Sequence, residues 1–303
     1  MKKTLFTGAG VALVTPFSKD GSIDYDMLGK IIDFQIEGGT DALIILGTTG
    51  EGSTVLFNER IECFDFSVRR AAGKVPVIAG SGSNSTDYTI QLAKAAESVG
   101  VDAHLVVTPY YNKTSQRGLV KHYFTVADST EKPIIIYNVP SRTGLNIKPE
   151  TYKELSKHDN IIAVKEANGN LSEMVKTRML CGDDLDIYVG NDDQVTVSAA
   201  IGAKGVISVL SNIMPKYTHD MAMYGVNGDI KKCAEMQMHI LPVVDALFCD
   251  VNPIPVKDIM RALGADCGDL RLPLCSMSDE QLDRALKSIA PFRQEILAEL
   301  SKI

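Results

Sequence analysis

Ile161-Ile162-Ala163-Val164-Lys165-Glu166 is the stretch of sequence from which the fold is most easily deduced. Four apolar residues in a row suit a short strand that is covered on both faces, as strands of parallel sheets are. Seven similar short runs recur along the first two thirds of the chain, and the seventh of the eight is the weakest. The other runs comprise residues 10–14, 42–46, 75–79, 103–107, 133–137, 186–190 and 205–209.

The segments between these runs have the periodicity of amphipathic helices. Met27, Leu28, Ile31 and Ile32 form one apolar stripe, and residues 90–96 carry another. Eight repeats of strand and helix predict an α/β protein with a (β/α)8 TIM barrel. The alternative is an open doubly wound sheet, but no G-x-G-x-x-G motif follows the first strand.

The strand pattern stops after about residue 225, and three helical stretches are expected at 229–247, 254–263 and 279–300. The last begins at Ser278, which can cap the helix while Gln281 reaches back to it. We therefore expect a barrel domain of residues 1–226 that carries the site. Residues 227–303 are expected to form a three-helix domain, packed on the barrel or on a neighbouring subunit.

The composition narrows the range of partners. The chain has 303 residues and a net charge of −7, with no long basic run, which argues against nucleic-acid binding. No apolar run reaches the ~18 residues of a membrane span. Gly8, Gly10 and Pro16 interrupt the apolar start of the chain, so this segment is interpreted as a strand and not as a signal peptide.

The cysteines and histidines show no metal or disulfide pattern. Six cysteines are scattered without a C-x-x-C pair, as in reduced cytoplasmic proteins. The five histidines have no zinc-binding spacing. We expect no metal and no cofactor.

Candidate site residues follow the ends of the strands, where barrels carry their chemistry. The second strand leads into Gly47-Thr48-Thr49-Gly50-Glu51-Gly52, a turn whose hydroxyls and exposed N–H groups suit a carboxylate or phosphate. A tight turn without a ligand is the other interpretation.

The fourth strand leads into Thr108-Pro109-Tyr110-Tyr111-Asn112, where the tyrosines could be core residues. The fifth ends in Tyr137-Asn138-Val139-Pro140-Ser141-Arg142, and its arginine is either solvated or a fork for a substrate carboxylate.

The lysine after the sixth strand is the strongest chemical signal. A charged, unpaired lysine at the end of a buried strand costs several kcal/mol, so Lys165 either pairs with Glu166, points outward, or has a lowered pKa. Lowering a lysine pKa from ~10.4 to about 7 or 8 raises the neutral fraction at pH 7 from under ~0.1% to tens of per cent. The neutral amine attacks ketones. Lys165, Tyr137 and a carboxylate-binding turn together predict a Schiff-base enzyme that acts on a 2-oxo acid.

These motifs, in this order, resemble those of the dihydrodipicolinate synthase and N-acetylneuraminate lyase superfamily. Residues 201–208 (Ile-Gly-Ala-Lys-Gly-Val-Ile-Ser) and 252–257 (Asn-Pro-Ile-Pro-Val-Lys) fit the same family, and the match covers essentially the whole chain. The consecutive Thr48-Thr49, the Ser141-Arg142-Thr143 segment and residues 252–257 resemble the synthase branch. That branch condenses pyruvate with L-aspartate 4-semialdehyde on the way to lysine and diaminopimelate.

The resemblance implies a role for each residue of the site. Lys165 would form the Schiff base, Tyr137 would transfer protons, and Thr48 and Tyr111 would complete a hydroxyl relay. Thr49 and the backbone at Ile207 would hold pyruvate, and Arg142 would bind the carboxylate of the semialdehyde and help to position Tyr137. Tyr111 would reach into the adjacent subunit of a homotetramer built from tight dimers.

Two alternatives remain open at this level. One is another pyruvate-dependent aldolase, such as a sialic acid lyase, and the other is a non-catalytic relative that senses a 2-oxo acid.

The resemblance also implies weak feedback inhibition by L-lysine. Of the effector-binding residues of lysine-inhibited relatives, Asn84 and Tyr110 are kept. Tyr88 stands where a glutamate is expected, and Phe57 stands near an expected histidine.

Overall fold

The computed structural model describes residues 2–301 and 303, and its centre is a set of eight short parallel strands. Each strand lies within two residues of the run predicted for it. The strands are β1 (Gly8–Ala12), β2 (Ala42–Ile45), β3 (Val77–Gly80), β4 (Ala103–Val107), β5 (Ile134–Asn138), β6 (Ile161–Glu166), β7 (Asp186–Val189) and β8 (Gly205–Ser208).

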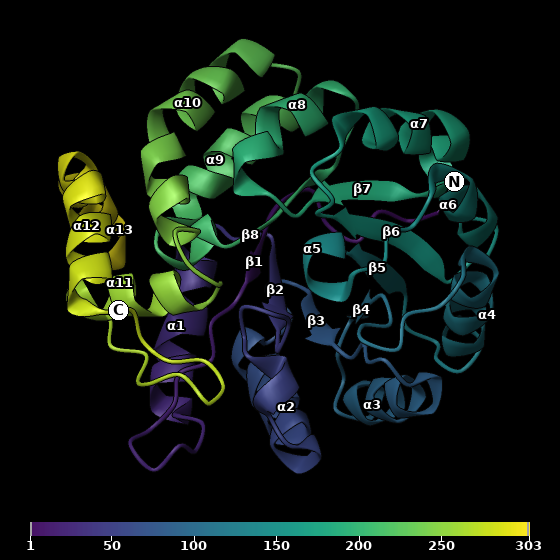
Figure 1. Ribbon diagram of the computed structural model, residues 1–303, viewed down its shortest axis with the longest axis horizontal. Coiled ribbons are helices and arrows are strands. Elements are labelled where there is room, and N and C mark those ends of the chain that lie inside the picture. Colours follow the sequence, from purple (N-terminus) through teal and green to yellow (C-terminus); the bar gives the residue numbers. More distant parts are fainter. Residues whose placement is uncertain (1, 302) are drawn as a thin grey trace.

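The strands close into a barrel in sequence order, with β8 paired to β1 (Figure 1). In the closing ladder Gly10 is the partner of Ile207, and in the β5–β6 ladder Tyr137 is the partner of Lys165. Closure excludes the open doubly wound sheet and confirms the predicted (β/α)8 barrel.

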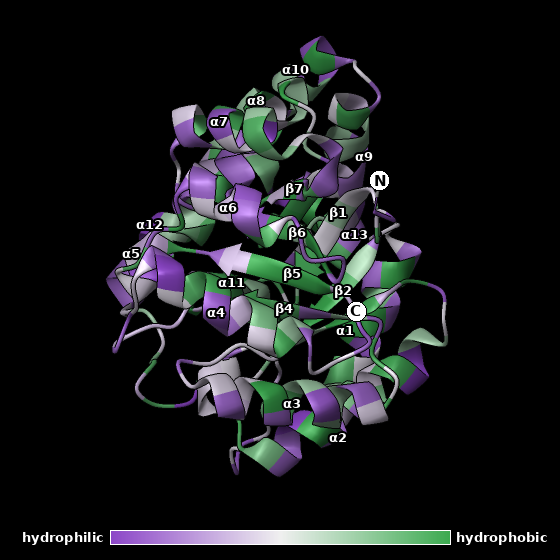
Figure 2. Cartoon of the chain, turned by 90° about the vertical axis from the view of Figure 1, so that its right-hand side faces the viewer, coloured by the Kyte–Doolittle hydropathy of each residue, from purple (hydrophilic) through white to green (hydrophobic). Residues whose placement is uncertain are grey.

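Side chains fill the barrel interior. Ile44, Ile78, Leu105 and Ile207 belong to one buried cluster inside the strands. At the amino-terminal end of the barrel, Phe6 stacks on Tyr188 with ring centroids 4.2 Å apart. In Figure 2 the strands are mostly green, and β5 turns pale and purple only at its arrowhead. The interior is therefore a packed core that leaves room for polar chemistry only where the strands end.

Helices surround the barrel, and several begin at the side-chain caps typical of helix starts. Asp24, Ser85, Ser115 and Asn170 each accept a hydrogen bond from a backbone N–H of the first turn of their helix. The helices are α1 (Tyr25–Glu37), α2 (Phe57–Ala71), α3 (Thr86–Ser98), α4 (Gln116–Ala127), α5 (Pro140–Thr143), α6 (Pro149–Leu155), α7 (Leu171–Cys181), α8 (Val195–Ala200), α9 (Pro215–Val226), α10 (Ile230–Leu247), α11 (Ile254–Ala262), α12 (Asp279–Ile289) and α13 (Arg293–Leu300).

The carboxyl-terminal segment is helical, as expected, but the single helix predicted for 279–300 is wrong. The chain forms α12, a 3-10 turn at Ala290–Phe292 and then α13. Pro291 lies in that turn and has no N–H to continue the α-helical ladder, which explains the break. The predicted capping box of Ser278 and Gln281 is confirmed at the start of α12. The domain boundary at residue 226 stays a prediction.

The yellow helices α12 and α13 lie at the edge of the molecule beside α10 and α11 (Figure 1). Ile289, Ile296 and Leu300 are buried there, so the apolar face expected for this segment does cover other residues of the chain. Among residues 2–301 and 303, no helix is both long and apolar enough to span a membrane.

Candidate active site

Lys165 lies in the barrel interior near the carboxyl end of β6, and only 6% of its surface is exposed. A glycine on the neighbouring strand's loop makes room for it. A Cβ atom on Gly190 would lie 3.0 Å from Cε of Lys165 and 2.8 Å from Cβ of Ala167. Any larger residue at position 190 would therefore press on the lysine side chain.

The Nζ atom of Lys165 lies over the ring of Tyr137, 4.6 Å from the ring centroid. The pKa of Lys165 is lowered to about 8, mainly by burial; the carboxylate of Asp192 opposes this shift, and the positive charge of Arg142 adds to it. At pH 7 a pKa of about 8 leaves roughly a tenth of the amine neutral, compared with under ~0.1% for an ordinary lysine. The site thus holds a buried amine that is competent as a nucleophile near neutral pH.

Asp192 is a site residue that the sequence reasoning missed. Its side chain is 1% exposed, and Oδ2 accepts hydrogen bonds from the backbone N–H groups of Val209 (2.9 Å) and Leu210 (3.0 Å). Burial raises the pKa of Asp192, and the charge of Lys165 lowers it. A signal was available, because Gly190-Asn191-Asp192-Asp193 places two carboxylates directly after the seventh strand.

The pairing of Lys165 with Glu166, one of the open interpretations, is wrong. Successive side chains of a strand point to opposite faces, so Glu166 points out of the barrel. Its carboxylate accepts hydrogen bonds from Asn138 Nδ2 (2.9 Å), the Tyr152 hydroxyl (2.8 Å) and the Asn168 N–H (2.9 Å). Burial raises the pKa of Glu166 to about 7, although these three bonds oppose the rise.

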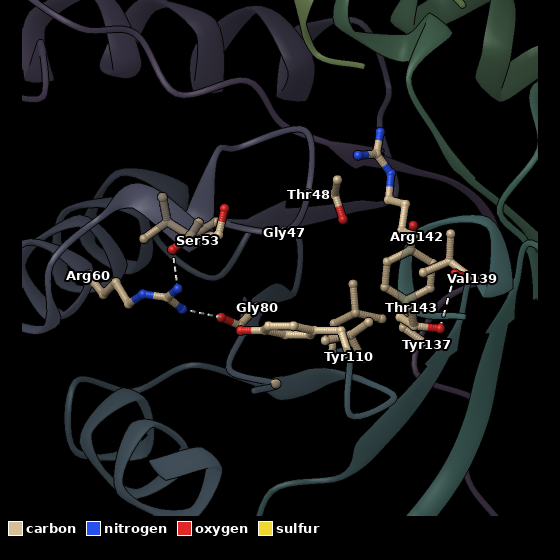
Figure 3. Close-up of a pocket in the computed structure, with 15 residues that line it drawn as sticks. Gly47, Thr48, Ser53, Arg60, Gly80, Tyr110, Tyr137, Val139, Arg142 and Thr143 are labelled. Carbon is tan, nitrogen blue, oxygen red and sulfur yellow. Dashed lines mark hydrogen bonds between the residues drawn. The ribbon is translucent and has the colours of Figure 1, made fainter. Parts of the chain in front are cut away.

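A cavity of about 230 Å³ opens above the ends of β2 to β5. Thr48, Tyr137 and Arg142 lie at one end of it, and Arg60 and Ser53 lie at the other, with the Tyr110 ring between them (Figure 3). The barrel thus brings together three of the predicted residues that are separated by almost a hundred positions in sequence. Lys165 lies beside this cavity, next to Tyr137.

The hydroxyl of Tyr137 has two polar neighbours that favour its ionised form. Burial raises the pKa of Tyr137, whereas the charge of Arg142 and a hydrogen bond with Thr48 lower it. Arg142 sits on the short helix α5, where a simple loop was expected, and its Nη2 donates to the Asn252 carbonyl at 2.8 Å. A tyrosine held between a threonine hydroxyl and a guanidinium can exchange protons with a neighbouring reactant.

Thr49 and Ile207 are placed less directly on the cavity. Thr49 is 2% exposed, and its hydroxyl oxygen accepts a hydrogen bond from Nδ2 of Asn252 at 2.9 Å. Ile207 is fully buried in β8 and faces the barrel interior. Neither residue lines the 230 Å³ cavity.

Tyr111 points away from the cavity of its own chain. Its side chain is 91% exposed, and its backbone is left-handed, with φ of +69°. Left-handed backbone is costly for a bulky residue, so the loop holds this tyrosine outward against a local preference. Tyr111 is not among the residues that line the cavity beside Thr48 and Tyr137.

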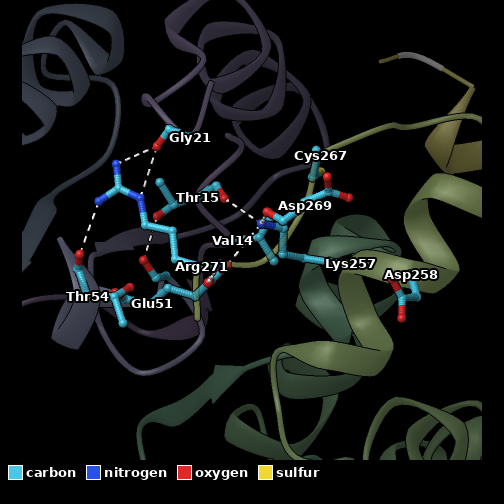
Figure 4. Close-up of polar contacts among 12 residues, drawn as sticks. Val14, Thr15, Gly21, Glu51, Thr54, Lys257, Asp258, Cys267, Asp269 and Arg271 are labelled. Carbon is cyan, nitrogen blue, oxygen red and sulfur yellow. Dashed lines mark hydrogen bonds and ion pairs between the residues drawn. The ribbon is translucent and has the colours of Figure 1, made fainter. Parts of the chain in front are cut away.

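The turn that carries Thr48 and Thr49 is held from below by buried charges (Figure 4). Glu51, whose φ is +53°, forms an ion pair with Lys257 of α11 at 2.9 Å, and both side chains are fully buried. Lys257 also donates to the Thr15 carbonyl (3.1 Å) and the Asp269 carbonyl (2.9 Å), while Glu51 Oε2 accepts from the Arg271 N–H (2.9 Å). These contacts join the turn at Glu51 and the loop at Thr15, which follows β1, to the carboxyl-terminal segment.

Two of the residues at the effector positions lie close to each other, because the ring centroids of Phe57 and Tyr88 are 6.3 Å apart. The loops that carry Asn84 and Tyr110 are joined by a hydrogen bond in which Nδ2 of Asn112 donates to the Asn84 carbonyl at 2.9 Å. Sequence reasoning missed Arg60, which is 7% exposed and donates to the carbonyls of Gly52, Val55 and Gly80. Burial lowers the pKa of Arg60, and the phenols of Tyr88 and Tyr110 oppose that shift.

Barrel and site together define a class of protein: a (β/α)8 barrel enzyme with a buried lysine and a tyrosine at the carboxyl ends of adjacent strands. Comparison with known proteins gives the family. Residues 5–290 match the model of the dihydrodipicolinate synthetase family. The chain therefore belongs to that family, and it is an enzyme, a lyase.

Individual relatives agree with this assignment. The 4-hydroxy-tetrahydrodipicolinate synthase of Caldicellulosiruptor saccharolyticus is 50% identical over 288 residues, which are 95% of this chain and 97% of the relative. The enzyme of the same name from Clostridium novyi is 49% identical over 92% of this chain and 94% of its own. The crystal structure of dihydrodipicolinate synthase from Aquifex aeolicus superposes with a TM-score of 0.92 at 40% identity, covering 95% of this chain and 98% of that one.

Proposed function

We propose that this enzyme condenses pyruvate with L-aspartate 4-semialdehyde to 4-hydroxy-tetrahydrodipicolinate through a Schiff base on Lys165. The observation that carries the proposal is the buried Lys165 amine, 4.6 Å from the centre of the Tyr137 ring, with its pKa lowered to about 8. The name shared by the relatives supports the substrates and a place in lysine and diaminopimelate biosynthesis.

The chemistry follows from the properties of the amine. Neutral Lys165 adds to the C2 carbonyl of pyruvate, and loss of water leaves the imine. Loss of a proton from the methyl carbon gives an enamine, whose carbon attacks the aldehyde of the second substrate. The amino group of that substrate then adds to C2 and closes the ring, and the Lys165 amine leaves. Each step moves a proton, and we assign these transfers to Tyr137, whose ring lies against the Lys165 amine.

Thr48 and Tyr111 complete the proton relay in this proposal. Thr48 lines the same cavity as Tyr137 and lowers the pKa of its phenol, and Tyr111 of an adjacent subunit would connect the relay to solvent. The exposure and left-handed backbone of Tyr111 support a role outside its own subunit. Leu56, at the start of α2, is 72% exposed, as expected of a surface that a second copy covers.

A homotetramer is supported by a second apolar surface. Leu171, Val175 and Met179 lie four residues apart along α7, and all three are exposed. A stripe at this spacing forms one face of a helix, away from the face that packs on the barrel. One surface for a tight dimer and another for pairing of dimers would give the proposed assembly.

The two carboxylates of the substrates need separate partners. We assign the pyruvate carboxylate and its oxo end to Thr49 and the backbone at Ile207, and the semialdehyde carboxylate to Arg142. Arg142 is exposed at the cavity wall, where an incoming second substrate can reach its guanidinium. Thr49 and Ile207 are both buried, as a subsite inside the barrel for the first substrate requires.

L-lysine should be a poor feedback inhibitor. Tyr88 supplies no charge for an effector ammonium group, and the Arg60 guanidinium adds a buried positive charge nearby. Glu51, an acid that could have substituted, is fully buried and paired with Lys257.

All six cysteines are free, which supports a reducing, cytoplasmic location.

Borohydride trapping tests the proposal. Pyruvate plus borohydride should place one reduced pyruvyl group on Lys165, located by peptide mass spectrometry. Lys165→Ala should abolish the label, and Lys231→Ala, at an exposed lysine of α10, should leave it unchanged. Label on another lysine, or none, would refute the Schiff base on Lys165.

A further inference from the structure

The segment that enters α11 contacts both residues assigned to substrate carboxylates. Nδ2 of Asn252 donates to Oγ1 of Thr49 at 2.9 Å, and the Asn252 carbonyl accepts from Nη2 of Arg142 at 2.8 Å. These contacts join positions separated by 203 and 110 residues in the chain. Asn252 is therefore the residue through which the turn after β2 and helix α5 are linked.

The direction of the Asn252–Thr49 hydrogen bond has a chemical consequence. A threonine hydroxyl has one hydrogen to donate, and its oxygen can accept. Because the Asn252 amide donates to Oγ1, the Thr49 hydrogen is free to be donated elsewhere. A carboxylate only accepts hydrogen bonds, so a threonine in this state is the partner it requires.

The remaining contacts indicate that the amide is directed at Thr49 and is not part of a structural network. Asn252 is 7% exposed, and its Oδ1 atom has no hydrogen-bond partner among the residues that the structure describes. The side chain is thus held by its bond to Thr49. The anchoring of this segment to the turn comes from Lys257 and Glu51, five residues further along the chain.

We propose that Asn252 is a positioning residue that fixes the Thr49 hydroxyl as a hydrogen-bond donor to the pyruvate carboxylate and, through its carbonyl, sets the place of Arg142. The inference rests on the proposed function, because it takes pyruvate as the ligand of Thr49. It assigns the orientation of the Thr49 hydroxyl to an uncharged residue that does not touch the reacting atoms.

Two substitutions separate this role from a structural one. Asn252→Ala removes the donor and leaves Thr49 free to turn, so the pyruvate concentration for half-maximal trapping should rise about threefold. Asn252→Asp offers only acceptors, so Thr49 must donate to position 252 and loses its hydrogen for the substrate. The carboxylate introduced at position 252 also repels the carboxylate of pyruvate. The pyruvate concentration for half-maximal trapping should therefore rise at least about tenfold. A merely structural role predicts the opposite order, because aspartate preserves the shape of asparagine.

The measurement is the rate of borohydride inactivation against pyruvate concentration, which reports Schiff-base formation without the second substrate. Thr49→Val should raise the pyruvate concentration for half-maximal trapping about tenfold. The double variant Asn252→Asp/Thr49→Val should bind pyruvate no more weakly than the weaker-binding single variant, because both substitutions act through one hydroxyl. Asn227→Asp, at an exposed residue after α9, is the control for added charge and should match the wild type.

The outcomes distinguish this inference from the proposed function. If the wild type is not trapped at Lys165, the proposed function fails. If the wild type is trapped but Asn252→Asp binds pyruvate as well as Asn252→Ala or better, the role of Asn252 is overturned. Independent, multiplied effects of the Asn252 and Thr49 variants overturn it as well. Thermal unfolding of each variant identifies any loss of fold.

Discussion

Nζ of Lys257 lies 2.9 Å from Oε1 of Glu51, and neither side chain exposes any surface to solvent. The pair connects α11 to the turn that carries Thr48 and Thr49, although 206 residues separate its members. Two opposite charges that are both buried hold this turn only as long as both are present, because either one alone is an unpaired charge in the interior.

Lys257→Met should therefore destabilise the protein by about 3–5 kcal/mol, because Glu51 would remain buried without its partner. Urea denaturation measures the loss. Lys287→Met is the control, since the Lys287–Asp283 pair is exposed and worth at most about 1 kcal/mol. A loss at Lys257 no larger than at Lys287 would show that the buried pair does not hold the turn.

The rate of imine formation should depend on pH through Lys165. Only the neutral amine reacts, so the rate constant for borohydride trapping at low pyruvate should rise about tenfold per pH unit below pH 8 and level off above it. Asp192→Asn removes the carboxylate that raises this pKa, so its profile should shift to lower pH. A profile that keeps rising to pH 10 would contradict the lowered pKa.

Tyr137→Phe and Thr48→Val should each lower kcat by ~10²–10³-fold, the range expected for a positioned proton-transfer group. Both substitutions remove a hydroxyl and keep the shape, so circular dichroism and thermal unfolding should match the wild type. Turnover is followed with pyruvate and aspartate semialdehyde in a coupled assay. Normal turnover in either variant would rule out the relay.

Tyr111 can be tested by mixing subunits. Tyr111→Phe should cut activity, and so should Lys165→Ala. When the two inactive variants are unfolded together and reassembled, half of the dimers should be mixed, and one of the two sites in each should be intact. About a quarter of wild-type activity should then return. No recovery would mean that Tyr111 serves its own subunit.

L-lysine should inhibit weakly, with half-inhibition above about 1 mM at saturating pyruvate. The cost of burying an effector cation near Arg60 without a carboxylate is several kcal/mol, and each 1.4 kcal/mol is about tenfold in affinity. Initial rates are measured with L-lysine raised through the millimolar range. Half-inhibition below 1 mM would show that another acid, such as Asp87, supplies the missing charge.

Short-range features of the sequence were enough to predict the elements of the fold. Each barrel strand was visible as an apolar run between polar turns, and the capping box at Ser278 marked the start of α12. These signals act over a few residues, through burial and local hydrogen bonds, so they can be deduced before the chain is folded. The break at Pro291 was also local, and the missing N–H of proline could have predicted it.

The site was predictable only in its parts. Tyr137 and Lys165 lie at the ends of their strands, and Thr48 and Arg142 follow theirs. The rule that barrel strands end at one face brings all four together. Their environments were less visible. Asp192 follows the seventh strand and could have been found by the same rule, but the contacts of Asn252 with Thr49 and of Lys257 with Glu51 join positions 203 and 206 residues apart. Such contacts exist only once the barrel has closed and the carboxyl-terminal helices have packed beside it.

The sequence alone determined which chemical groups line the mouth of the barrel. Tertiary structure decided the charges and hydrogen bonds around them, because electrostatic and hydrogen-bond energies depend on distances in space and not on positions along the chain.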